Sequence, residues 1–316
     1  MKLSVIIPIY NEEPNIKVLY ERLKKVCLQI TEDHEIIFVN DGSRDRSILL
    51  IHELSGNDKC VKYINFSRNF GHQVAVSAGL DHTKGEAVVI IDADLQDPPE
   101  LINDMYNKLQ EGYEVVYAKR RTRAGENFLK RFTAKLFYRI LGRITSINIP
   151  VDTGDFRIMD KKIVEVLRMM PEQQKFLRGQ ISWIGFKQTY VEYDRDVRHG
   201  GETGYTYKKM IRFALDGITS FSNLPLKFAT FTGFIVAGIT FITIIYALYS
   251  RFITHDVVPG WTSMILAILF IGGVQLICIG IIGEYISRLG ANVRNRPLYI
   301  IRESNIELQN NNTTNK

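Results

Sequence analysis

Two long stretches without a charged residue constrain this chain more than any other feature. No Asp, Glu, Lys or Arg occurs between Lys227 and Arg251, or between Asp256 and Glu284. Each stretch exceeds the roughly 20 apolar residues that an α-helix needs to cross the hydrocarbon of a bilayer. A pair of buried core helices is the alternative, but such helices seldom run this far without a charge. We therefore predict two transmembrane helices, over about residues 228–250 and 259–283.

Basic residues flank the pair of stretches on its outer sides. They are Lys208, Lys209, Arg212 and Lys227 before the first stretch, and Arg288, Arg294, Arg296 and Arg302 after the second. Because basic flanks favour the cytoplasmic side, we expect a multi-pass protein of the cell (inner) membrane with both termini in the cytoplasm. The chain then divides into a cytoplasmic domain (1–205), an amphipathic juxtamembrane helix (206–226), a transmembrane region (227–285) and a cytoplasmic tail (286–316).

The net charge of +6 is compatible with binding to nucleic acid or to an anionic membrane. We expect no nucleic-acid partner, because no recognised nucleic-acid-binding motif is present and the positive charge borders the apolar stretches. The three cysteines are scattered and have no CxxC spacing, so neither a disulfide framework nor a zinc site is indicated. A single Lys2 before a short apolar run does not resemble a cleavable signal peptide, and none is expected.

The first 91 residues alternate between β-branched runs and segments with helical spacing. We predict strands at 3–9, 35–39, 61–66 and 87–91, and helices at 15–30, 46–54 and 71–82. Alternation of this kind is typical of an α/β fold, in which a parallel sheet carries helices on both faces. Ligands of such sheets bind at the carboxyl ends of the strands.

Polar motifs follow the first two predicted strands. They read PIYNE at residues 8–12 and NDGS at residues 40–43. The Asp41 carboxylate is able to accept from a base imide or a ribose hydroxyl, the Tyr10 ring is able to pack on a base, and Gly42 permits close backbone approach. An ordinary turn is the alternative, since Asp-Gly-Ser is common in turns.

Asp92 and Asp94 directly follow the apolar run at residues 88–91, in the motif DADLQDPPE. Two carboxylates one residue apart at a strand end are able to turn toward one Mg²⁺ or Mn²⁺ ion, which also binds diphosphate oxygens. A purely structural role requires some other cation, because an unpaired carboxylate cluster at a buried strand end is costly. We therefore predict a divalent metal site here.

Four motifs, IIPIYNEEPN, VNDGS, DADLQDPPE and TGDFR, occur in this order. With them the chain resembles family 2 glycosyltransferases of the GT-A fold, and among these the polyprenyl-phosphate glycosyltransferase group, which includes bactoprenol glucosyltransferases and relatives of dolichyl-phosphate mannose synthase. The resemblance covers nearly the whole chain. It implies a GT-A (Rossmann-like) nucleotide-sugar-binding domain with a mostly parallel sheet, followed by two C-terminal transmembrane helices.

The resemblance also implies roles for individual residues. It places around the nucleotide sugar Pro8, Tyr10, Glu12, Asp41, Asp92 and, in a loop that closes over the diphosphate, Arg198. It places at the metal Asp92, Asp94 and Gln96, and it makes Asp94 and Asp155 catalytic, with Asp155 facing the acceptor. From the residues alone, Asp155 suits a helix N-cap before Phe156 as well.

Residues 119–143 interleave basic residues with Phe and Leu at spacings of three and four, which predicts a basic amphipathic helix. A solvated surface helix is the commoner explanation of such a charge run. The adjoining spans favour a membrane-facing helix instead, because anionic lipids attract basic segments. Five of its residues are expected to attract the acceptor phosphate and the membrane: Arg120, Arg121, Arg123, Lys130 and Arg131.

The resemblance finally implies the reaction. We expect transfer of a single hexose, with UDP-glucose as the expected donor, to a polyprenyl phosphate such as undecaprenyl phosphate on the cytoplasmic face of the membrane, with inversion and with Mg²⁺ or Mn²⁺. A homo-oligomer is also implied. Two alternatives stay open: the same reaction with GDP-mannose, a UDP-N-acetylhexosamine or a UDP-aminoarabinose derivative, and a non-catalytic membrane protein that binds a nucleotide sugar.

Overall fold

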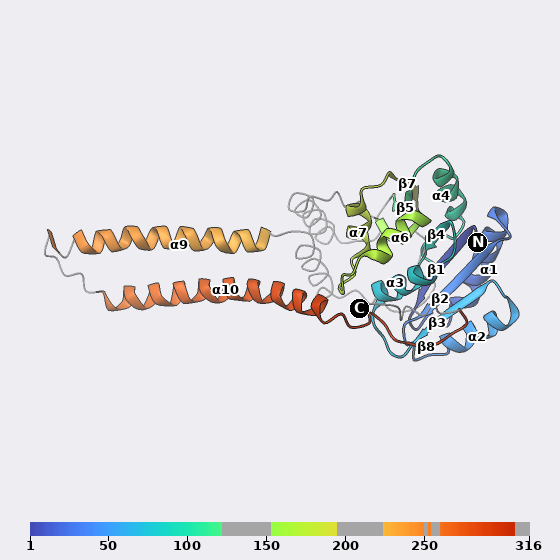
Figure 1. The fold of residues 1–316 in the computed structure, drawn as a ribbon, viewed down its shortest axis with the longest axis horizontal. Helices are drawn as coiled ribbons and strands as arrows, with labels where there is room; N and C mark the ends of the chain where they lie inside the picture. The colour runs from blue at the N-terminus through green and yellow to red at the C-terminus, as the bar shows by residue number, and fades with distance from the viewer. Residues whose placement is uncertain (122–152, 195–223, 250–251, 254–259, 307–316) are drawn as a thin grey trace, which may run out of the picture.

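The computed structural model describes residues 1–121, 153–194, 224–249, 252–253 and 260–306. Within these residues an eight-stranded sheet lies between two layers of helices, and a long helical hairpin extends away from this α/β domain (Figure 1).

The sheet is mixed but mostly parallel, with the strand order β7-β5-β6-β4-β1-β2-β3-β8. Neighbouring strands from β4 through β3 run parallel, whereas β6 and β8 run antiparallel to their neighbours. The strands are β1 (Leu3–Ile9), β2 (His34–Asn40), β3 (Val61–Phe66), β4 (Ala87–Ile90), β5 (Val115–Arg120), β6 (Thr153–Asp160), β7 (Gln188–Tyr193) and β8 (Ile301–Ser304). The predicted α/β class is confirmed.

The helices alternate with the first four strands as the sequence predicts. Every strand and helix predicted within the first 91 residues is present, with its ends displaced by a few residues at most. The helices in the described residues are α1 (Ile16–Ile30), α2 (Ser47–Asn57), α3 (His72–His82), α4 (Leu101–Gln110), α6 (Lys161–Met169), α7 (Leu177–Ile184), α9 (Leu224–Tyr249) and α10 (Trp261–Val293).

Strand β1 is buried on both faces at the centre of the sheet. Val5 and Ile7 pack on the side that is covered by α1, α2 and α4, whereas Ile6 packs with α3, α6 and α7. Burial on both faces explains why β1 is a continuous apolar run and not an alternating one. Helix α3 approaches β1 so closely that a Cβ atom at Gly79 would lie 2.3 Å from Cγ2 of Ile6.

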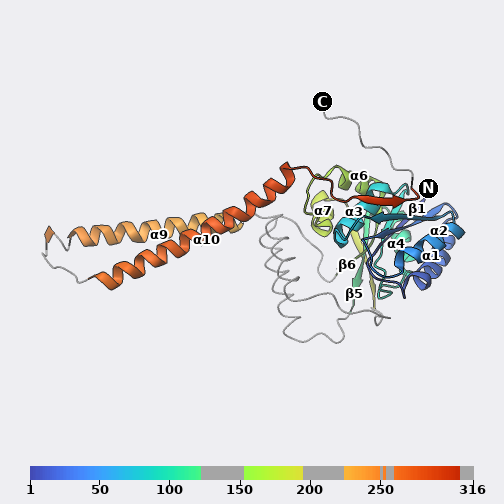
Figure 2. The same cartoon turned by 90° about the horizontal axis from the view of Figure 1, so that it is seen from below.

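The hairpin consists of α9 and α10, which lie side by side (Figures 1 and 2). Large apolar side chains of both helices are exposed. Each contains a candidate membrane span, Pro225–Thr243 in α9 and Phe270–Val293 in α10. Only 6% of the first span and 0% of the second is buried. The alternative of buried core helices is therefore wrong, and a lipid environment suits this surface.

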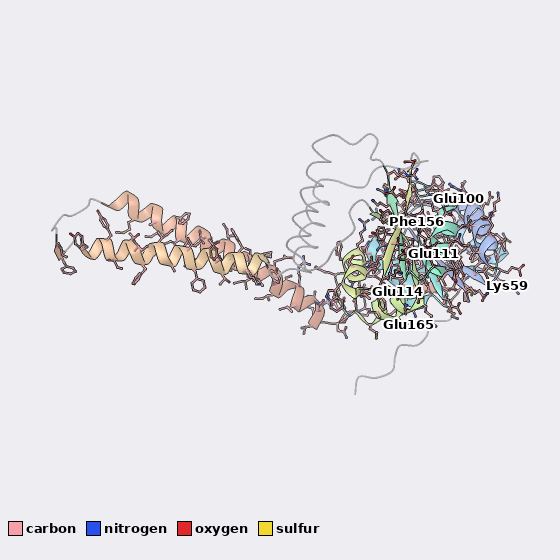
Figure 3. The ribbon with its side chains drawn as sticks, turned by 90° about the horizontal axis from the view of Figure 1, so that it is seen from above. Lys59, Glu100, Glu111, Glu114, Phe156 and Glu165 are labelled. Atoms are coloured by element: carbon pink, nitrogen blue, oxygen red, sulfur yellow. The ribbon has the colours of Figure 1, made fainter. Side chains whose placement is uncertain are left out.

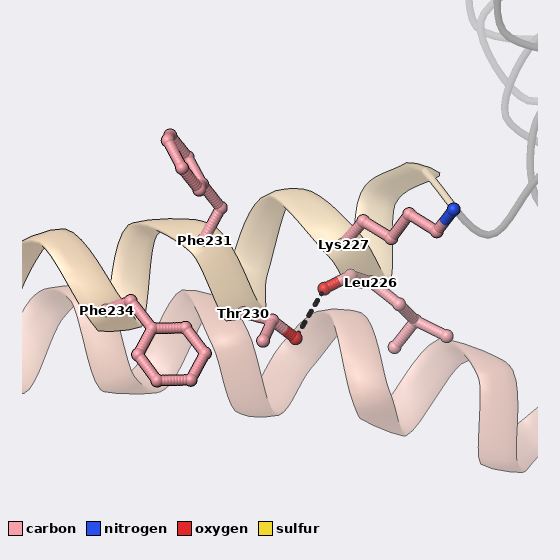
Figure 4. A pocket seen from close by; sticks show the side chains of 5 residues that line it. All are labelled: Leu226, Lys227, Thr230, Phe231 and Phe234. Atoms are coloured by element: carbon pink, nitrogen blue, oxygen red, sulfur yellow. Dashed lines mark hydrogen bonds between the residues drawn. The ribbon is translucent and has the colours of Figure 1, made fainter.

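A small hollow lies at the start of α9 and is shown in Figure 4. Thr230 within it donates to the Leu226 carbonyl at 3.0 Å, a bond inside the helix that hides the hydroxyl from an apolar medium. The lining residues are Leu226, Lys227, Thr230, Phe231 and Phe234. This hollow belongs to the outer surface of the candidate span, and none of the polar motifs contributes to it.

The residues after the second span return to the domain. Helix α10 continues to Val293, past the predicted end of the span, and an ion pair of 3.0 Å between Arg288 and Glu284 supports its last turns. Strand β8 then pairs antiparallel with β3 (Figure 1). Tyr299 stacks on Phe66 at a centroid distance of 5.2 Å. Part of the expected cytoplasmic tail is thus an edge strand of the sheet.

We expect Gly79→Ala to destabilise the domain, because the new methyl group would overlap Ile6. Overpacking of this kind costs about 1–3 kcal/mol. The control is Gly56→Ala in α2, where nothing lies within 4 Å of a new Cβ atom, and where alanine favours the helix. Thermal unfolding in detergent should give a lower midpoint for Gly79→Ala only; the same midpoint for both variants would contradict the close packing of α3 on β1.

Candidate active site

Strands β1 and β4 diverge at their carboxyl ends. Ile91 donates its backbone N–H to the Ile6 carbonyl at 3.1 Å, while β1 continues to Ile9. Pro8 lies two residues after Ile6, so its backbone also faces β4. The pairing with β4 has already ended at this point. The N–H group that proline lacks is therefore not needed for a hydrogen bond between the strands. The chain turns from β1 to β2 on one side and later to β4 on the other, and ligands of open α/β sheets bind at such switch points.

The segments after β1 and β2 are hydrogen-bonded to each other. We call residues 10–15 and 41–47 the donor loops, because they contain Tyr10, Glu12 and Asp41, which the family resemblance places around the nucleotide-sugar donor. Asn11 donates its backbone N–H to Ser43 Oγ at 3.0 Å, and Asn11 Oδ1 accepts from the Arg44 N–H at 2.8 Å. Glu12 donates its N–H to Ser47 Oγ at 3.1 Å. These bonds make the two loops one unit at the carboxyl ends of β1 and β2.

Tyr10 and Glu12 occupy different environments within this unit. The Tyr10 side chain is 43% exposed, as a ring that stacks on a base requires. The Glu12 carboxylate accepts from Asn15 Nδ2 at 2.6 Å and so helps to hold the loop. Contacts of Pro8, Tyr10 and Glu12 with a nucleotide stay predictions.

Asp41 organises the segment that follows β3. Its carboxylate accepts the backbone N–H groups of Phe70 at 2.6 Å and of Gly71 at 2.9 Å. Burial raises the pKa of Asp41, and these two hydrogen bonds offset part of that rise. Gly42 has a φ of 66°, and a Cβ atom there would lie 2.5 Å from the backbone of Arg68. The close approach that Gly42 permits is therefore to this segment of the chain.

Asp92 and Asp94 follow β4 at the switch point. Asp92 Oδ1 is buried and accepts no hydrogen bond from the described residues, although His72 Nε2 lies 3.6 Å away. Burial raises the pKa of Asp92, His72 lowers it, and the charges of Asp155, Asp97 and Asp94 raise it, so that the net pKa is about 6. Such an environment favours the binding of a cation beside Asp92.

The donor set for a metal is small. Among the described residues, no three His, Cys, Asp or Glu side chains gather as a metal cluster. Mg²⁺ usually binds through one or two carboxylates together with substrate phosphates. The buried, hydrogen-bond-free Oδ1 of Asp92 and the nearby Asp94 fit a divalent ion that a diphosphate shares, with Gln96 two residues further on.

Strand β6 brings Asp155 to the same edge of the sheet. Because β6 runs antiparallel to β4, its first residues lie beside the last residues of β4, with Arg157 opposite Ile90. Asp155 lies inside this strand, so the alternative of a helix N-cap is wrong.

The Asp155 carboxylate is surrounded by donors and is 13% exposed. Arg178 Nε donates to Oδ1 at 2.8 Å, while His72 Nε2 lies 3.0 Å and Gln73 Nε2 3.2 Å from Oδ2. Burial raises the pKa of Asp155, but Arg178, His72 and Arg157 outweigh this effect and hold the pKa well below its usual range. Asp155 is therefore ionised at neutral pH.

His72 is the cationic partner that links the two acidic groups. Burial lowers the pKa of His72, but Asp92 and Asp155 outweigh it and raise the pKa to about 9. The imidazole ring is therefore protonated at neutral pH, so both of its nitrogens are donors. Since His72 opens α3, this helix connects Asp92, after β4, with Asp155, in β6.

A second polar group lies beside the first. Tyr193 donates its hydroxyl to the buried Asp97 Oδ1, and Arg120 Nε donates to the Tyr193 oxygen at 3.3 Å. Gly154 leaves room for Arg120, whose Nη2 would lie 3.2 Å from a Cβ atom there. Arg120 is thus held at the end of β5, on the same edge as Asp155.

The basic residues predicted to attract the acceptor are only partly described. Arg120 ends strand β5, so the amphipathic helix expected from residue 119 onward does not begin there. The Arg121 side chain is 58% exposed and lies 3.8 Å from Asp194. Four predicted site residues lie outside the described residues: Arg123, Lys130, Arg131 and Arg198.

Sequence reasoning missed several residues of this site. His72 and Gln73 follow strand β3 at its carboxyl end, which was a usable signal for a ligand-binding position. Arg178 has no such signal. It lies on α7, and the packing of α7 with α6 and α3 places it beside Asp155. Asp97 lies in the DADLQDPPE motif, but its partner Tyr193 lacks a signal, since the two meet across 96 residues of sequence.

Comparison with known proteins shows the family of this chain. Residues 4–168 match the family described as Glycosyl transferase family 2. The chain belongs to glycosyl transferase family 2. Residues 224–289 of this family 2 glycosyltransferase match the GtrB C-terminal hairpin, which corresponds to α9 and α10. The expected GT-A fold and the two apolar C-terminal helices are confirmed, and the chain is a transferase.

Curated relatives match nearly the whole chain. It is 50% identical over 304 residues to "Uncharacterized glycosyltransferase YkcC" of Bacillus subtilis (strain 168), covering 96% of this chain and 94% of the relative. It is 41% identical over 304 residues to "SfII prophage-derived bactoprenol glucosyl transferase" of Shigella flexneri, covering 96% and 98%. It is also 41% identical over 302 residues to "Prophage bactoprenol glucosyl transferase homolog" of Escherichia coli (strain K12), covering 96% and 99%.

We expect Asp155→Asn in this family 2 glycosyltransferase to lower thermal stability, because it leaves His72, Arg157 and Arg178 without their shared anion. Breaking a buried ion pair by removal of one partner costs about 3–5 kcal/mol. Asp104→Asn is the control, since Asp104 is exposed on α4. Unfolding midpoints in detergent measure the difference, and a midpoint for Asp155→Asn equal to that of the control would show that Asp155 does not balance these cations.

Proposed function

We propose that the chain transfers a single glucose from UDP-glucose to a polyprenyl phosphate at the cytoplasmic face of the membrane. The observation that carries the proposal is the 41% identity, over 96% of this chain, to a protein named bactoprenol glucosyl transferase. This match includes both the strand-end site and the helical hairpin. UDP-glucose is the donor that the family resemblance implies.

The position of the hairpin supports a lipid-linked acceptor. The last turns of α10 contact the domain directly: Gln173 donates its backbone N–H to Asn292 Oδ1 at 3.1 Å, and Arg288 donates to Gln174 Oε1. The domain therefore lies at one end of the candidate spans, within reach of a lipid headgroup. Because β8 joins the same sheet as β1, the segments before and after the hairpin lie on one side of the membrane.

The carboxylates after β4 suit the departing diphosphate. Asp92 and Asp94 would hold Mg²⁺ or Mn²⁺ there, and such an ion, when bound, would neutralise charge on the nucleoside diphosphate as it leaves. Tyr10 and the donor loops would hold the nucleoside at the neighbouring strand ends.

In the proposed reaction an oxygen of the lipid phosphate forms a bond to the anomeric carbon while the bond from that carbon to the diphosphate breaks. One displacement of this kind inverts the anomeric configuration. A phosphate monoester is already anionic at neutral pH, so little proton abstraction is required. Asp155 therefore acts by holding Arg178 and His72, whose positive charge faces the place where an anionic acceptor would arrive.

A radiolabelled transfer assay tests this function. In detergent with undecaprenyl phosphate, UDP-[¹⁴C]glucose and Mg²⁺ or Mn²⁺, we expect wild-type protein to form labelled lipid, and Asp94→Ala to lose about 10²–10³-fold in rate, the range for removal of one electrostatic contact at a reacting centre. Chelation of the metal should abolish transfer. Asp104→Ala, a change at an exposed carboxylate on α4, is the control.

The same assay separates the open alternatives. Turnover of GDP-mannose, a UDP-N-acetylhexosamine or a UDP-aminoarabinose derivative in place of UDP-glucose would replace the donor and keep the reaction class. Metal-dependent binding of a nucleotide sugar without turnover would instead support a non-catalytic binding protein. Wild-type rates in Asp94→Ala would contradict the proposed site.

The proposed orientation has its own test. A green fluorescent protein fused after Lys316 should fluoresce in cells, and alkaline phosphatase at the same point should be inactive, because both termini are placed in the cytoplasm. The opposite pattern, with the fusion still membrane-bound and active in transfer, would overturn this topology.

A further inference from the structure

A continuous chain of hydrogen bonds joins the C-terminal strand to the donor loops. Glu303 Oε1 in β8 accepts from Asn65 Nδ2 at 2.7 Å, and Asn65 Oδ1 accepts from Asn40 Nδ2 at 2.8 Å. Asn40 Oδ1 accepts from Ser43 Oγ at 2.5 Å, and Ser43 Oγ accepts the Asn11 N–H at 3.0 Å. We call Glu303, Asn65 and Asn40 the relay, because they connect the strand that follows the second span with both donor loops.

The relay has one direction, and Glu303 sets it. A carboxylate only accepts, so Asn65 must present its amide nitrogen to Glu303 and its oxygen to Asn40. Asn40 must then present its own oxygen to Ser43. This oxygen also accepts the backbone N–H of Ser43 at 3.4 Å. In this arrangement the Ser43 hydroxyl donates to Asn40, and its oxygen accepts the Asn11 N–H. The bond from Asn11 to Ser43 links the two donor loops.

Burial makes this orientation matter. Asn40 is 2% exposed and Asn65 is 6% exposed, so solvent does not replace a lost partner. A buried amide without its partner is destabilising, because no hydrogen bond replaces the one it made with water in the unfolded chain. If Asn65 reversed, its nitrogen would face the Asn40 nitrogen, and Asn40 would have to reverse in turn. The Asn40 nitrogen would then face the Ser43 N–H, and the turn at the start of the second donor loop would lose its acceptor.

The C-terminal strand holds Glu303 in place by contacts that do not involve the relay. Glu303 lies directly opposite Asn65 in the pairing of β8 with β3. Asn305 accepts the Tyr63 N–H at 2.7 Å and donates to the Val61 carbonyl at 3.1 Å. Ser304 Oγ donates to the Tyr63 carbonyl at 2.9 Å. The register of β8 therefore places the Glu303 carboxylate at the carboxyl end of β3.

We propose that Glu303, Asn65 and Asn40 are positioning residues for the nucleotide-sugar donor, and that the strand following the second span sets the shape of the donor loops. This inference rests on the proposed function in assigning those loops to the donor. None of the three relay residues is expected to touch the donor; they act through Ser43 and Asn11.

Glu303→Lys is the main test, because it replaces the acceptor at the end of the relay by a donor. An ammonium group only donates, so a hydrogen bond with it requires Asn65 to present its oxygen instead of its nitrogen. We expect the KM for UDP-glucose to rise about fivefold, the factor that corresponds to the net contribution of one hydrogen bond, while kcat changes less than about twofold. Glu303→Gln keeps an acceptor oxygen at this position and should restore a KM close to that of the wild type.

Two controls separate positioning from general damage. Glu111→Lys makes the same charge change at an exposed site on the domain (labelled in Figure 3) and should leave KM unchanged. Ser304→Ala removes the bond to Tyr63 without touching the relay, so it should lower the unfolding midpoint and leave KM unchanged. A rise in KM with Ser304→Ala as large as with Glu303→Lys would overturn the relay, since strand attachment alone would then explain the effect.

The remaining outcomes also decide between the two proposals. An unchanged KM in folded Glu303→Lys overturns the positioning role while wild-type turnover upholds the proposed function. If the wild type turns over none of the nucleotide sugars, the proposed function fails, and the dissociation constants for UDP and GDP replace KM in the same comparison. Equal dissociation constants for wild type and Glu303→Lys, or binding of neither nucleotide, then overturn the positioning role as well.

Discussion

The charge balance around Asp155 is the interaction on which the rest of the site depends. One buried carboxylate joins strand β6 to the first turn of α3 through His72 and to α7 through Arg178. Each of these cations would be costly beside the others without a shared anion, because buried like charges repel in a medium of low dielectric constant. With Asp155 ionised, the same cations stay fixed and charged at an edge where anionic substrates would meet. In the proposed function, Asp155 therefore serves both the stability of the domain and the binding of the acceptor.

Opposite charges are divided across the switch point in a way that suits transfer between two phosphates. Asp92 and Asp94 lie after β4, where a metal would compensate them together with a departing diphosphate. Arg178 lies at Asp155 in β6 and Arg120 at the end of β5, whereas His72 lies between Asp92 and Asp155. In the proposed reaction the incoming phosphate would meet Arg178 and Arg120 while the leaving diphosphate meets the metal, so each anion would have its own counter-charge.

The residues that follow the helical hairpin return to the domain, where β8 pairs with β3 as an edge strand. Pairing with β8 also replaces β3 at the edge of the sheet by a strand of 4 residues, and short edge strands limit unwanted pairing with other chains. The strand that protects the sheet also carries Glu303, so attachment to the membrane and the geometry of the donor loops share a single segment.

Local patterns in the sequence determined much of this protein. The apolar run at residues 3–9, the helical spacing after it and the uncharged stretches near the C-terminus each depend on neighbours a few residues apart, so the first strands and helices and the two candidate spans were predictable. Motifs mark Asp92, Asp94 and Asp155, so the sequence alone predicts them as site residues. Only the tertiary structure decided that Asp41 binds the Phe70 and Gly71 backbone, that Arg178 meets Asp155, and that Glu303 pairs with Asn65 across 238 residues of sequence. Such contacts follow from how strands and helices pack in three dimensions, and no periodicity or spacing along the chain records them.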